Sequence, residues 1–172
     1  MALRRDIKFS YVIEVTDWGF SYSFGLPWND LFEDGDPFWE SNYLAVAGTL
    51  LVPDRSPTPT AKLSIWPMSA LNFENRSRLK PTGYGGASLS KGQFEAGLHV
   101  PTEMFHPIMT AIEAGKIRYI ELNGEKLFRN DAKIDRFWCW RSLEDERRAE
   151  LQKPWIEAAK RKPSKAQKKT TR

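Results

Sequence analysis

Four carboxylates gather in one short segment, and oxygen ligands of this kind are the ones that hard cations prefer. They lie within seven residues around Gly35. Ca²⁺ takes about six to eight oxygen ligands and needs a sharp turn, which such a loop can supply. The spacing lacks the alternating acids and the final glutamate of an EF-hand loop. A solvated acidic loop is therefore the first interpretation and a cation site the alternative, with Asp30, Glu33, Asp34 and Asp36 as candidate metal ligands.

Aromatic rings flank the same carboxylates and bring carbohydrate chemistry into consideration. Trp28, Trp39 and Tyr43 are candidate ligand-binding residues, because a sugar ring can stack on their flat faces. Glycoside hydrolysis needs two carboxyl groups about 5–10 Å apart, across the bond that is cut. The acidic aromatic loop 28–43 therefore has two functional interpretations, a hydrolase and a non-catalytic carbohydrate-binding module. The structural alternative is that the rings anchor a long loop onto the domain.

The basic C-terminal tail offers a third kind of chemistry, the binding of polyanions. Residues 147–172 hold ten Lys and Arg against two Glu, whereas the other 146 residues hold 16 basic and 20 acidic side chains. The tail therefore has a net charge of +8 and the rest of the chain a net charge of −4. Contacts of Lys and Arg with phosphate groups need no ordered fold. We expect an acidic protein surface as partner, the acidic segment 9–54 of a second copy in a homo-oligomer included, with nucleic acid as the alternative. The candidate residues are Lys160, Arg161, Lys162, Lys165, Lys168 and Lys169.

The remaining reactive side chains predict little chemistry. Cys139 is the single cysteine, which excludes an internal disulfide and a cysteine-cluster zinc site. Its position between two tryptophans favours an inert core residue. His99 falls on a predicted strand and His106 at a predicted helix start, so a shared metal is not expected. No cofactor and no catalytic signature is predicted.

Alternating residues indicate the strands that must position these groups. Residues 7–15 alternate apolar with polar side chains, and residues 18–24 alternate aromatic with small ones. Thr16-Asp17 between them fits a tight turn, so we predict a hairpin. Its second strand has a wholly aromatic face, which we expect in the core. Further strands are predicted at 43–52, 61–66, 94–100, 117–122, 125–128 and 133–141.

Turn and helix signals complete the prediction. Asn123-Gly124 is the strongest hairpin signal in the chain. Apolar residues at helical spacing predict a short helix in which Pro107 fits the first helical position. Gly115 fits the position just after the end of this helix. Pro154 is expected to interrupt a charged helix after Ser142. Eight strands with one short internal helix predict an antiparallel β-sandwich or Greek-key barrel over residues 1–146 and a basic, helical to disordered tail over 147–172.

Length and composition limit the function classes. A chain of 172 residues with 41% hydrophobic residues is typical of one folded domain. No apolar run approaches about 18 residues, and the N-terminus leads into an alternating segment, so neither a membrane span nor a secretory signal is expected. The sequence predicts a cytoplasmic, non-enzymatic binding or interaction protein. The alternatives are a nucleic-acid-associated protein that uses the tail and a hydrolase or carbohydrate-binding module that uses loop 28–43.

Overall fold

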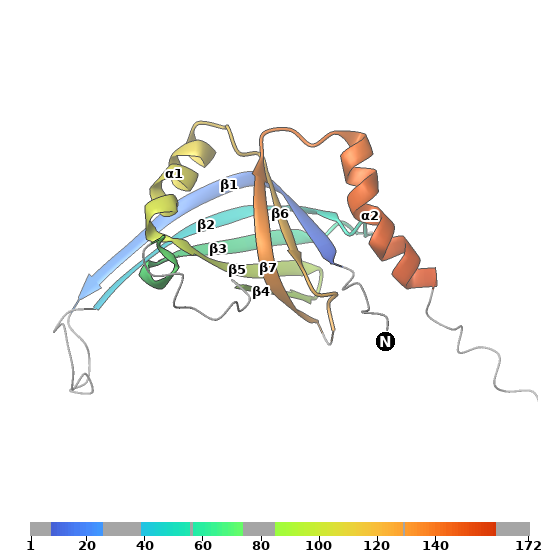
Figure 1. The fold of residues 1–172 in the computed structure, drawn as a ribbon, viewed down its shortest axis with the longest axis horizontal. Coiled ribbons are helices and arrows are strands. Elements are labelled where there is room, and N and C mark those ends of the chain that lie inside the picture. The colour runs from blue at the N-terminus through green and yellow to red at the C-terminus, as the bar shows by residue number, and fades with distance from the viewer. Residues whose placement is uncertain (1–7, 26–38, 56, 74–84, 129, 161–172) are drawn as a thin grey trace, which may run out of the picture.

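Seven strands form one mixed sheet that closes on itself (Figure 1). The computed structural model describes residues 8–25, 39–55, 57–73, 85–128 and 130–160. Around the barrel the strands follow the order β1-β2-β3-β5-β4-β7-β6. They are β1 (Phe9–Gly25), β2 (Trp39–Val52), β3 (Thr60–Met68), β4 (Gly85–Ser90), β5 (Gln93–Pro101), β6 (Tyr119–Gly124) and β7 (Asp131–Trp140). The helices are α1 (Thr102–Glu113) and α2 (Asp145–Lys160), with a 3-10 turn at Ser69–Leu71.

The mainly-β class is confirmed, but the strands differ from the prediction. The two strands predicted at 7–15 and 18–24 are one strand, β1. Strand 125–128 is reduced to an isolated bridge at Phe128. β4 is an additional strand, whose apolar alternation is limited to Ala87 and Leu89 and is too short to predict it. The described residues thus form seven strands instead of eight. The sheet is not wholly antiparallel, since β3 and β5 run parallel, and it is a single closed sheet and not two packed sheets.

The predicted turn at Thr16-Asp17 is a β-bulge. Val15 pairs with Gly48 and Asp17 with Ala47, which leaves Thr16 as an extra residue in β1. A bulge of this kind bends the strand and shifts its alternation by one position. Before the bulge Tyr11 and Ile13 face the interior, and after it the even-numbered Trp18 does so, paired with the buried Val46.

β1 continues past the barrel as half of an arm, residues 18–25 paired with 39–46, which extends beyond α1 (Figure 1). β3 still pairs with residues 44–46, so among the described strands the arm is two-stranded only from Ser21 to Gly25. Its aromatic side chains emerge progressively into solvent. Phe20 contacts the ring of Phe105 on α1 at 6.2 Å between centroids but is 46% exposed, and Phe24 is 58% exposed. The expectation of a buried aromatic face is therefore wrong for Phe20, Tyr22 and Phe24, because the arm leaves the barrel before any described element covers it.

Packed aromatic and aliphatic side chains fill the barrel and the face under α1. Tyr11 stacks on Phe94 at 5.3 Å, and its hydroxyl donates to the Glu125 carbonyl at 2.7 Å. Burial raises the pKa of Tyr11, so this donor stays protonated. α1 buries Phe105, Ile108 and Ile112 at helical spacing.

Several local predictions at turns and helices need correction. α1 begins at Thr102 and contains Pro107, because the buried face of the helix outweighs one missing hydrogen bond. Gly115 does follow the helix end, at φ 65°. Asn123-Gly124 forms the end of β6 and pairs with β7, and the connection follows it, with Asn130 at φ 75°. Among the helices that the structure describes, none is long and apolar enough to cross a membrane.

α2 packs against the start of β1 without a break at Pro154. Trp155 contacts the rings of Phe9 and Tyr11 at 4.7 and 5.2 Å, and its indole N–H donates to the Ser10 carbonyl at 2.9 Å. One turn earlier Leu151 is also buried. Pro154 is tolerated within the helix, since the buried contacts on either side of it hold the helix against the barrel.

A buried polar cluster fixes the first turn of α2. The carboxylate of Glu121 on β6 is 2% exposed and accepts from the amide of Asn123 at 2.8 Å and from the indole of Trp140 at 3.3 Å. The guanidinium of Arg147 on α2 lies 3.6 Å from the same carboxylate. A buried charge is costly unless it is paired and hydrogen-bonded, so this cluster favours one position of α2 on the barrel.

We expect the contact of Trp155 to contribute most to the docking of α2. Trp155→Ala removes a large buried ring and one hydrogen bond, and it should lower the free energy of unfolding by about 3–5 kcal/mol. Ile156→Ala is the matched control, because Ile156 is the next residue on the same helix and is 46% exposed. It should change stability by less than about 0.5 kcal/mol. Urea unfolding followed by circular dichroism measures both, and equal losses would contradict this role.

Candidate functional site

The outward face of β3, β5 and β4 forms a shallow surface floored by small residues. Leu63 and Ile65 of β3 are buried, so the residues alternating with them face outward. The same holds for β5, where Ala96 and Leu98 are buried. The outward positions are Lys62, Ser64 and Trp66 on β3, Glu95, Gly97 and His99 on β5, and Gly86 and Ser88 on β4.

Trp66 has the largest side chain among the described outward residues of these three strands, and its position depends on Gly97. A Cβ at Gly97 would lie 2.7 Å from Cζ3 of Trp66, closer than real Cβ contacts allow. The ring therefore uses the space that the missing side chain leaves. His99 packs against the ring at 5.7 Å between centroids, and Tyr43 of β2 lies at 6.1 Å on its other side.

One hollow opens on each side of this ring. We call the ring and the two hollows together the Trp66 groove. The first, of about 430 Å³, is lined by Glu40, Ser41 and Asn42 of β2, by Trp66, Pro67 and Met68, and by His99. The second, of about 550 Å³, is lined by Lys62, Ser64, Trp66, Gly86, Ala87, Ser88, Glu95, Ala96, Gly97, Asp131 and Ala132. Hydroxyl, carboxylate and ammonium groups thus surround a single indole.

The charged groups of the second hollow lie at the end away from Trp66. Lys62 stands opposite Glu95 in the β3–β5 register, and Ser88 stands between Glu95 and Asp131 across β5, β4 and β7. The carboxylates of Glu95 and Asp131 are thus two strand spacings apart, about 10 Å at the backbone. Both residues are exposed. The hollow therefore offers an aromatic wall at one end and solvated hydrogen-bonding groups at the other.

The candidate ligand-binding and metal residues of loop 28–43 are only partly placed. Tyr43 lies beside the Trp66 groove, against the Trp66 ring. Trp39 begins β2, but its side chain lies outside the described residues, as does the whole of Trp28. The same is true of the candidate metal ligands Asp30, Glu33, Asp34 and Asp36. Within the part of the chain that the structure describes, no three metal-ligating side chains come together.

The candidate polyanion-binding residues fall mostly beyond α2. Lys160, the last residue of α2, is exposed. The other five lie outside the described residues: Arg161, Lys162, Lys165, Lys168 and Lys169. Trp155 is 8% exposed, so it offers no ring for stacking on a base.

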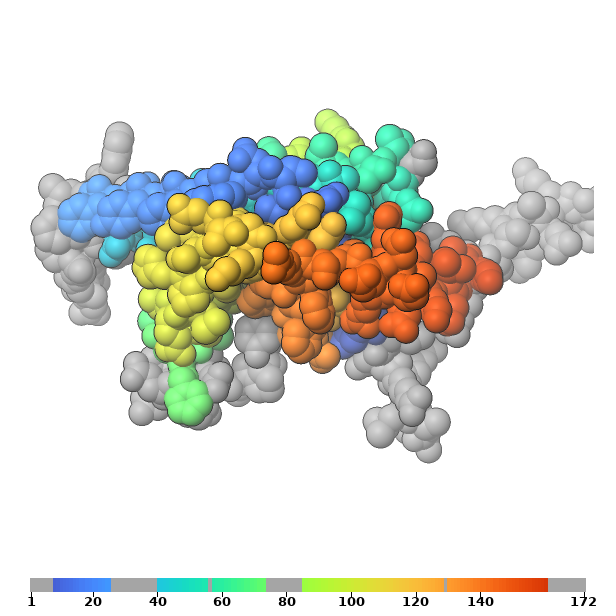
Figure 2. All heavy atoms as spheres, turned by 90° about the horizontal axis from the view of Figure 1, so that it is seen from above, coloured from blue at the N-terminus to red at the C-terminus, as the bar shows by residue number. Residues whose placement is uncertain are grey.

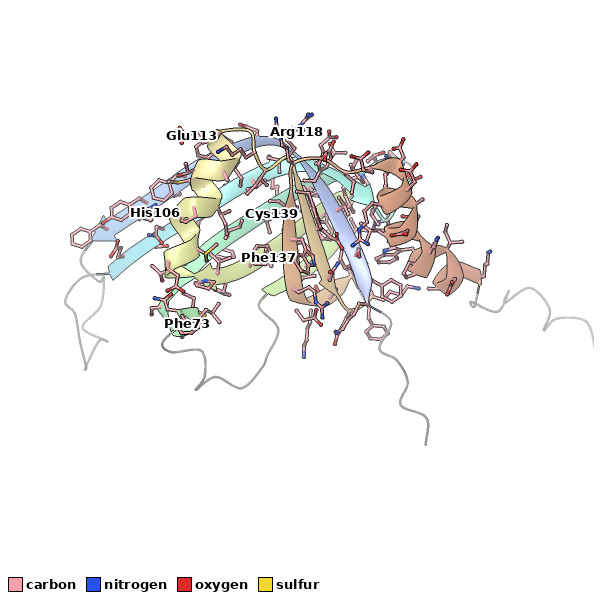
Figure 3. All side chains as sticks on the ribbon, turned by 45° about the horizontal axis from the view of Figure 1, so that its top comes forward. Phe73, His106, Glu113, Arg118, Phe137 and Cys139 are labelled. Atoms are coloured by element: carbon pink, nitrogen blue, oxygen red, sulfur yellow. The ribbon has the colours of Figure 1, made fainter. Side chains whose placement is uncertain are left out.

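The two histidines and the cysteine occupy separate environments. His99 contacts Trp66, whereas His106 lies on α1 against the ring of Phe105. Cys139 lies on β7, opposite Ile120 of β6 and across from α1 (Figure 3). It is half-buried, and desolvation raises the pKa of its thiol to about 11.

Sequence reasoning missed Trp66 as a site residue, although the signal was present. Ala61, Leu63 and Ile65 alternate with Lys62, Ser64 and Trp66, so the large ring falls on the polar face of its strand. A tryptophan in that position is either an exposed binding residue or has a partner beyond the strand. Its partner glycine is 31 residues later in the chain, and no local pattern connects Trp66 with Gly97.

Comparison with known proteins gives no relative to guide the interpretation. The chain matches no family model, and no significant similarity was found to the curated proteins or to the solved structures. The geometry of the described residues is therefore the basis on which a function can be assigned.

Gly97→Ala should move the Trp66 ring, because the new methyl group would overlap Cζ3. The indole N–H resonance of Trp66 should shift in a ¹⁵N–¹H spectrum, with the assignment made from Trp66→Phe. Gly86→Ala is the control, since a Cβ there meets only the Ala132 carbonyl oxygen at 3.7 Å. It should leave the resonance in place. An unshifted resonance in Gly97→Ala would show that the ring does not lie over Gly97.

Cys139 should react slowly with iodoacetamide in the folded protein. With a pKa of about 11, roughly 0.1% of the thiol is ionised at pH 8, against roughly 25% for a thiol of ordinary pKa 8.5. The rate should rise about tenfold per pH unit up to pH 11. Because the folded thiol has the higher pKa, stability should fall as pH rises above about 8.5. Urea-unfolded protein is the control, and equal rates in both states at pH 8 would contradict the burial of this thiol.

Proposed function

We propose that this chain is a non-enzymatic ligand-binding protein whose binding surface is the Trp66 groove. The observation that supports the proposal is the position of Trp66, half-buried between two hollows and flanked by Tyr43 and His99. An indole held in this way is pre-organised, since three neighbours restrict its movement before a ligand arrives. Pre-organisation lowers the entropy cost of binding.

The lining of the groove favours a carbohydrate, most simply a short oligosaccharide. A sugar ring has a face of C–H groups, which can pack on an indole, and a rim of hydroxyl groups, which need hydrogen-bonding partners. Ser64 and Ser88 can donate or accept, Glu95 and Asp131 can accept, and Lys62 can donate. The small floor at Gly86 and Gly97 lets such a ring approach the sheet closely. The proposal thus retains the carbohydrate-binding role considered from the sequence and keeps Tyr43 in the site. The central residue of the site is Trp66.

Binding without hydrolysis is favoured by the solvation of the two carboxylates. A glycosidase needs one carboxylic acid that holds its proton near neutral pH, which requires an apolar or crowded environment. Glu95 and Asp131 are both exposed, and Lys62 stands opposite Glu95. The two carboxylates thus lie in solvent and not in such an environment, and the proposal assigns both as hydrogen-bond acceptors.

The proposal predicts that Trp66→Ala abolishes saccharide binding. A panel of neutral and acidic oligosaccharides screened by ligand-observed NMR should give at least one ligand, with a Kd on the order of 0.1 mM, equivalent to about −5.5 kcal/mol. Trp66→Ala should weaken that Kd at least tenfold. Trp138→Ala is the matched control, because Trp138 is a 50% exposed tryptophan on β7 that does not line the groove. It should change the Kd less than twofold.

Three outcomes would contradict this assignment. If no oligosaccharide binds, or if both tryptophan variants lose affinity equally, the groove is not a carbohydrate site. If the ligand is cleaved, and Glu95→Gln or Asp131→Asn stops the cleavage without loss of binding, the hydrolase interpretation replaces the non-enzymatic one.

A further inference from the structure

Among the described residues, no strand pairs with the outer edge of β1 along the arm. β6 pairs with β1 only from Phe9 to Glu14, and the last backbone contact beyond it joins the Val15 N–H to the Arg118 carbonyl at 2.8 Å. From Asp17 to Gly25, β2 is the only strand that pairs with β1 among the described residues. A strand edge without a partner strand is a template for another strand.

The peptide groups that face this edge can be identified from the bulge. The Trp18 N–H is accepted by the carboxylate of Asp17 at 2.8 Å and not by β2. Successive N–H groups in a strand point to opposite sides. The N–H groups of Phe20, Tyr22 and Phe24 therefore face the open edge, as that of Trp18 does, and those of Gly19, Ser21 and Ser23 face β2.

Beyond the bulge at Thr16, the edge carries neither charge nor proline to protect it. Natural proteins discourage edge pairing with lysine, proline or inward-pointing charges. Residues 18–25 contain no charged residue and no proline, and residues 9–54 contain no Lys or Arg. Three of the aromatic side chains in this strand, Phe20, Tyr22 and Phe24, are 46–58% exposed.

We propose that this edge pairs antiparallel with the same edge of a second copy of the chain, about a twofold axis at Ser21. The sequence is self-complementary in this register: Trp18 meets Phe24, Phe20 meets Tyr22, and Ser21 meets itself. The N–H groups of Phe20 and Tyr22 face the edge, so this central pair exchanges two backbone hydrogen bonds. Their side chains share one face of the joined sheet, where cross-strand aromatic pairs are favourable. Asp17 meets Gly25, so no like charges face each other.

The described elements around the arm leave room for a second strand. Figure 2 shows the β1 side of the arm beside α1 and not beneath it. α1 touches the inner face of the arm through Phe105 and Phe20, a contact perpendicular to the direction in which the new strand would pair. A second copy fits this edge, because its own strand carries the matching alternation of aromatic and small residues.

Backbone pairing is tested by the oligomeric state of the full chain. Analytical ultracentrifugation from 1 to 100 µM should show a species of twice the 19.8 kDa monomer mass. Tyr22→Pro removes an N–H that faces the edge and leaves the pairing with β2 intact, so it should raise the dimer dissociation constant at least 100-fold. Tyr22→Ala is the control, because it removes the ring but keeps the N–H, and it should raise the constant less than tenfold. A wild-type monomer at 100 µM, or a Tyr22→Pro dimer of unchanged affinity, would overturn the proposal.

The register is tested by disulfide formation in a Cys139→Ser background. Ser21→Cys should form an intermolecular disulfide under mild oxidation, because residues facing each other in a non-hydrogen-bonded pair have Cα atoms about 4.5 Å apart. Ser23→Cys is the control on the same face. It meets Gly19 of the second copy and lies about 13 Å along the strand from its own counterpart, so it should remain a free thiol. Equal cross-linking of both variants, or of neither, would overturn this register even if Tyr22→Pro failed to fold.

Discussion

One inserted residue, Thr16, determines on which face of the molecule the aromatic residues of β1 lie. The strand begins inside the barrel with odd-numbered residues pointing inward, and a regular continuation would turn Trp18, Phe20, Tyr22 and Phe24 to the outside. The bulge reverses this, so the stripe continues the inner face and Phe20 meets α1. Gly48, opposite Val15, allows the close approach, since a Cβ there would lie 2.0 Å from the Glu14 carbonyl oxygen. The barrel, the seat of α1 and the arm thus depend on the same bend in β1.

The exchanged order of β4 and β5 creates the outward groove in a similar way. β5 lies next to β3 and runs parallel to it, whereas β4 lies on the far side of β5. This order places Gly97 beside Trp66 and Gly86 beyond Gly97, so small residues lie in a row next to a large one. If β4 and β5 exchanged places, Trp66 would face the strand of Gly86 and Ser88 instead of the strand that carries Gly97 and His99. The groove is therefore a product of sheet order and not of any single segment.

The strands of the barrel could be predicted where alternation is regular, and the errors occur where one local pattern is compatible with two structures. A shift in alternation at Thr16-Asp17 fits a turn as well as a bulge, and only the partner strand distinguishes them. Asn123-Gly124 is a strong hairpin signal locally, but pairing with Arg136 and Ile134 of β7 extends the strand through it. The local cost of proline predicts a helix start at Pro107 and an interruption at Pro154, whereas the buried faces that compensate for this cost pack against distant residues. Tyr43 was chosen for its neighbours in sequence, and its structural neighbour Trp66 belongs to the next strand.

The two proposed surfaces meet at Ser21, and their continuity would raise the affinity for a long ligand. Ser21 pairs with Tyr43, which contacts Trp66, which contacts His99, so one row crosses β1, β2, β3 and β5 on the outer face. A twofold axis at Ser21 extends this row into the second copy with its outer face on the same side. The two Trp66 rings would then lie five strand spacings apart, about 24 Å along a continuous surface. A saccharide chain long enough to reach both could gain affinity from its second contact without any new interaction, because that contact is intramolecular. A shallow groove and a symmetric arm are therefore compatible features of one binding surface. A single shallow groove binds weakly, and dimerisation through the arm provides a second groove that raises the affinity for a long ligand.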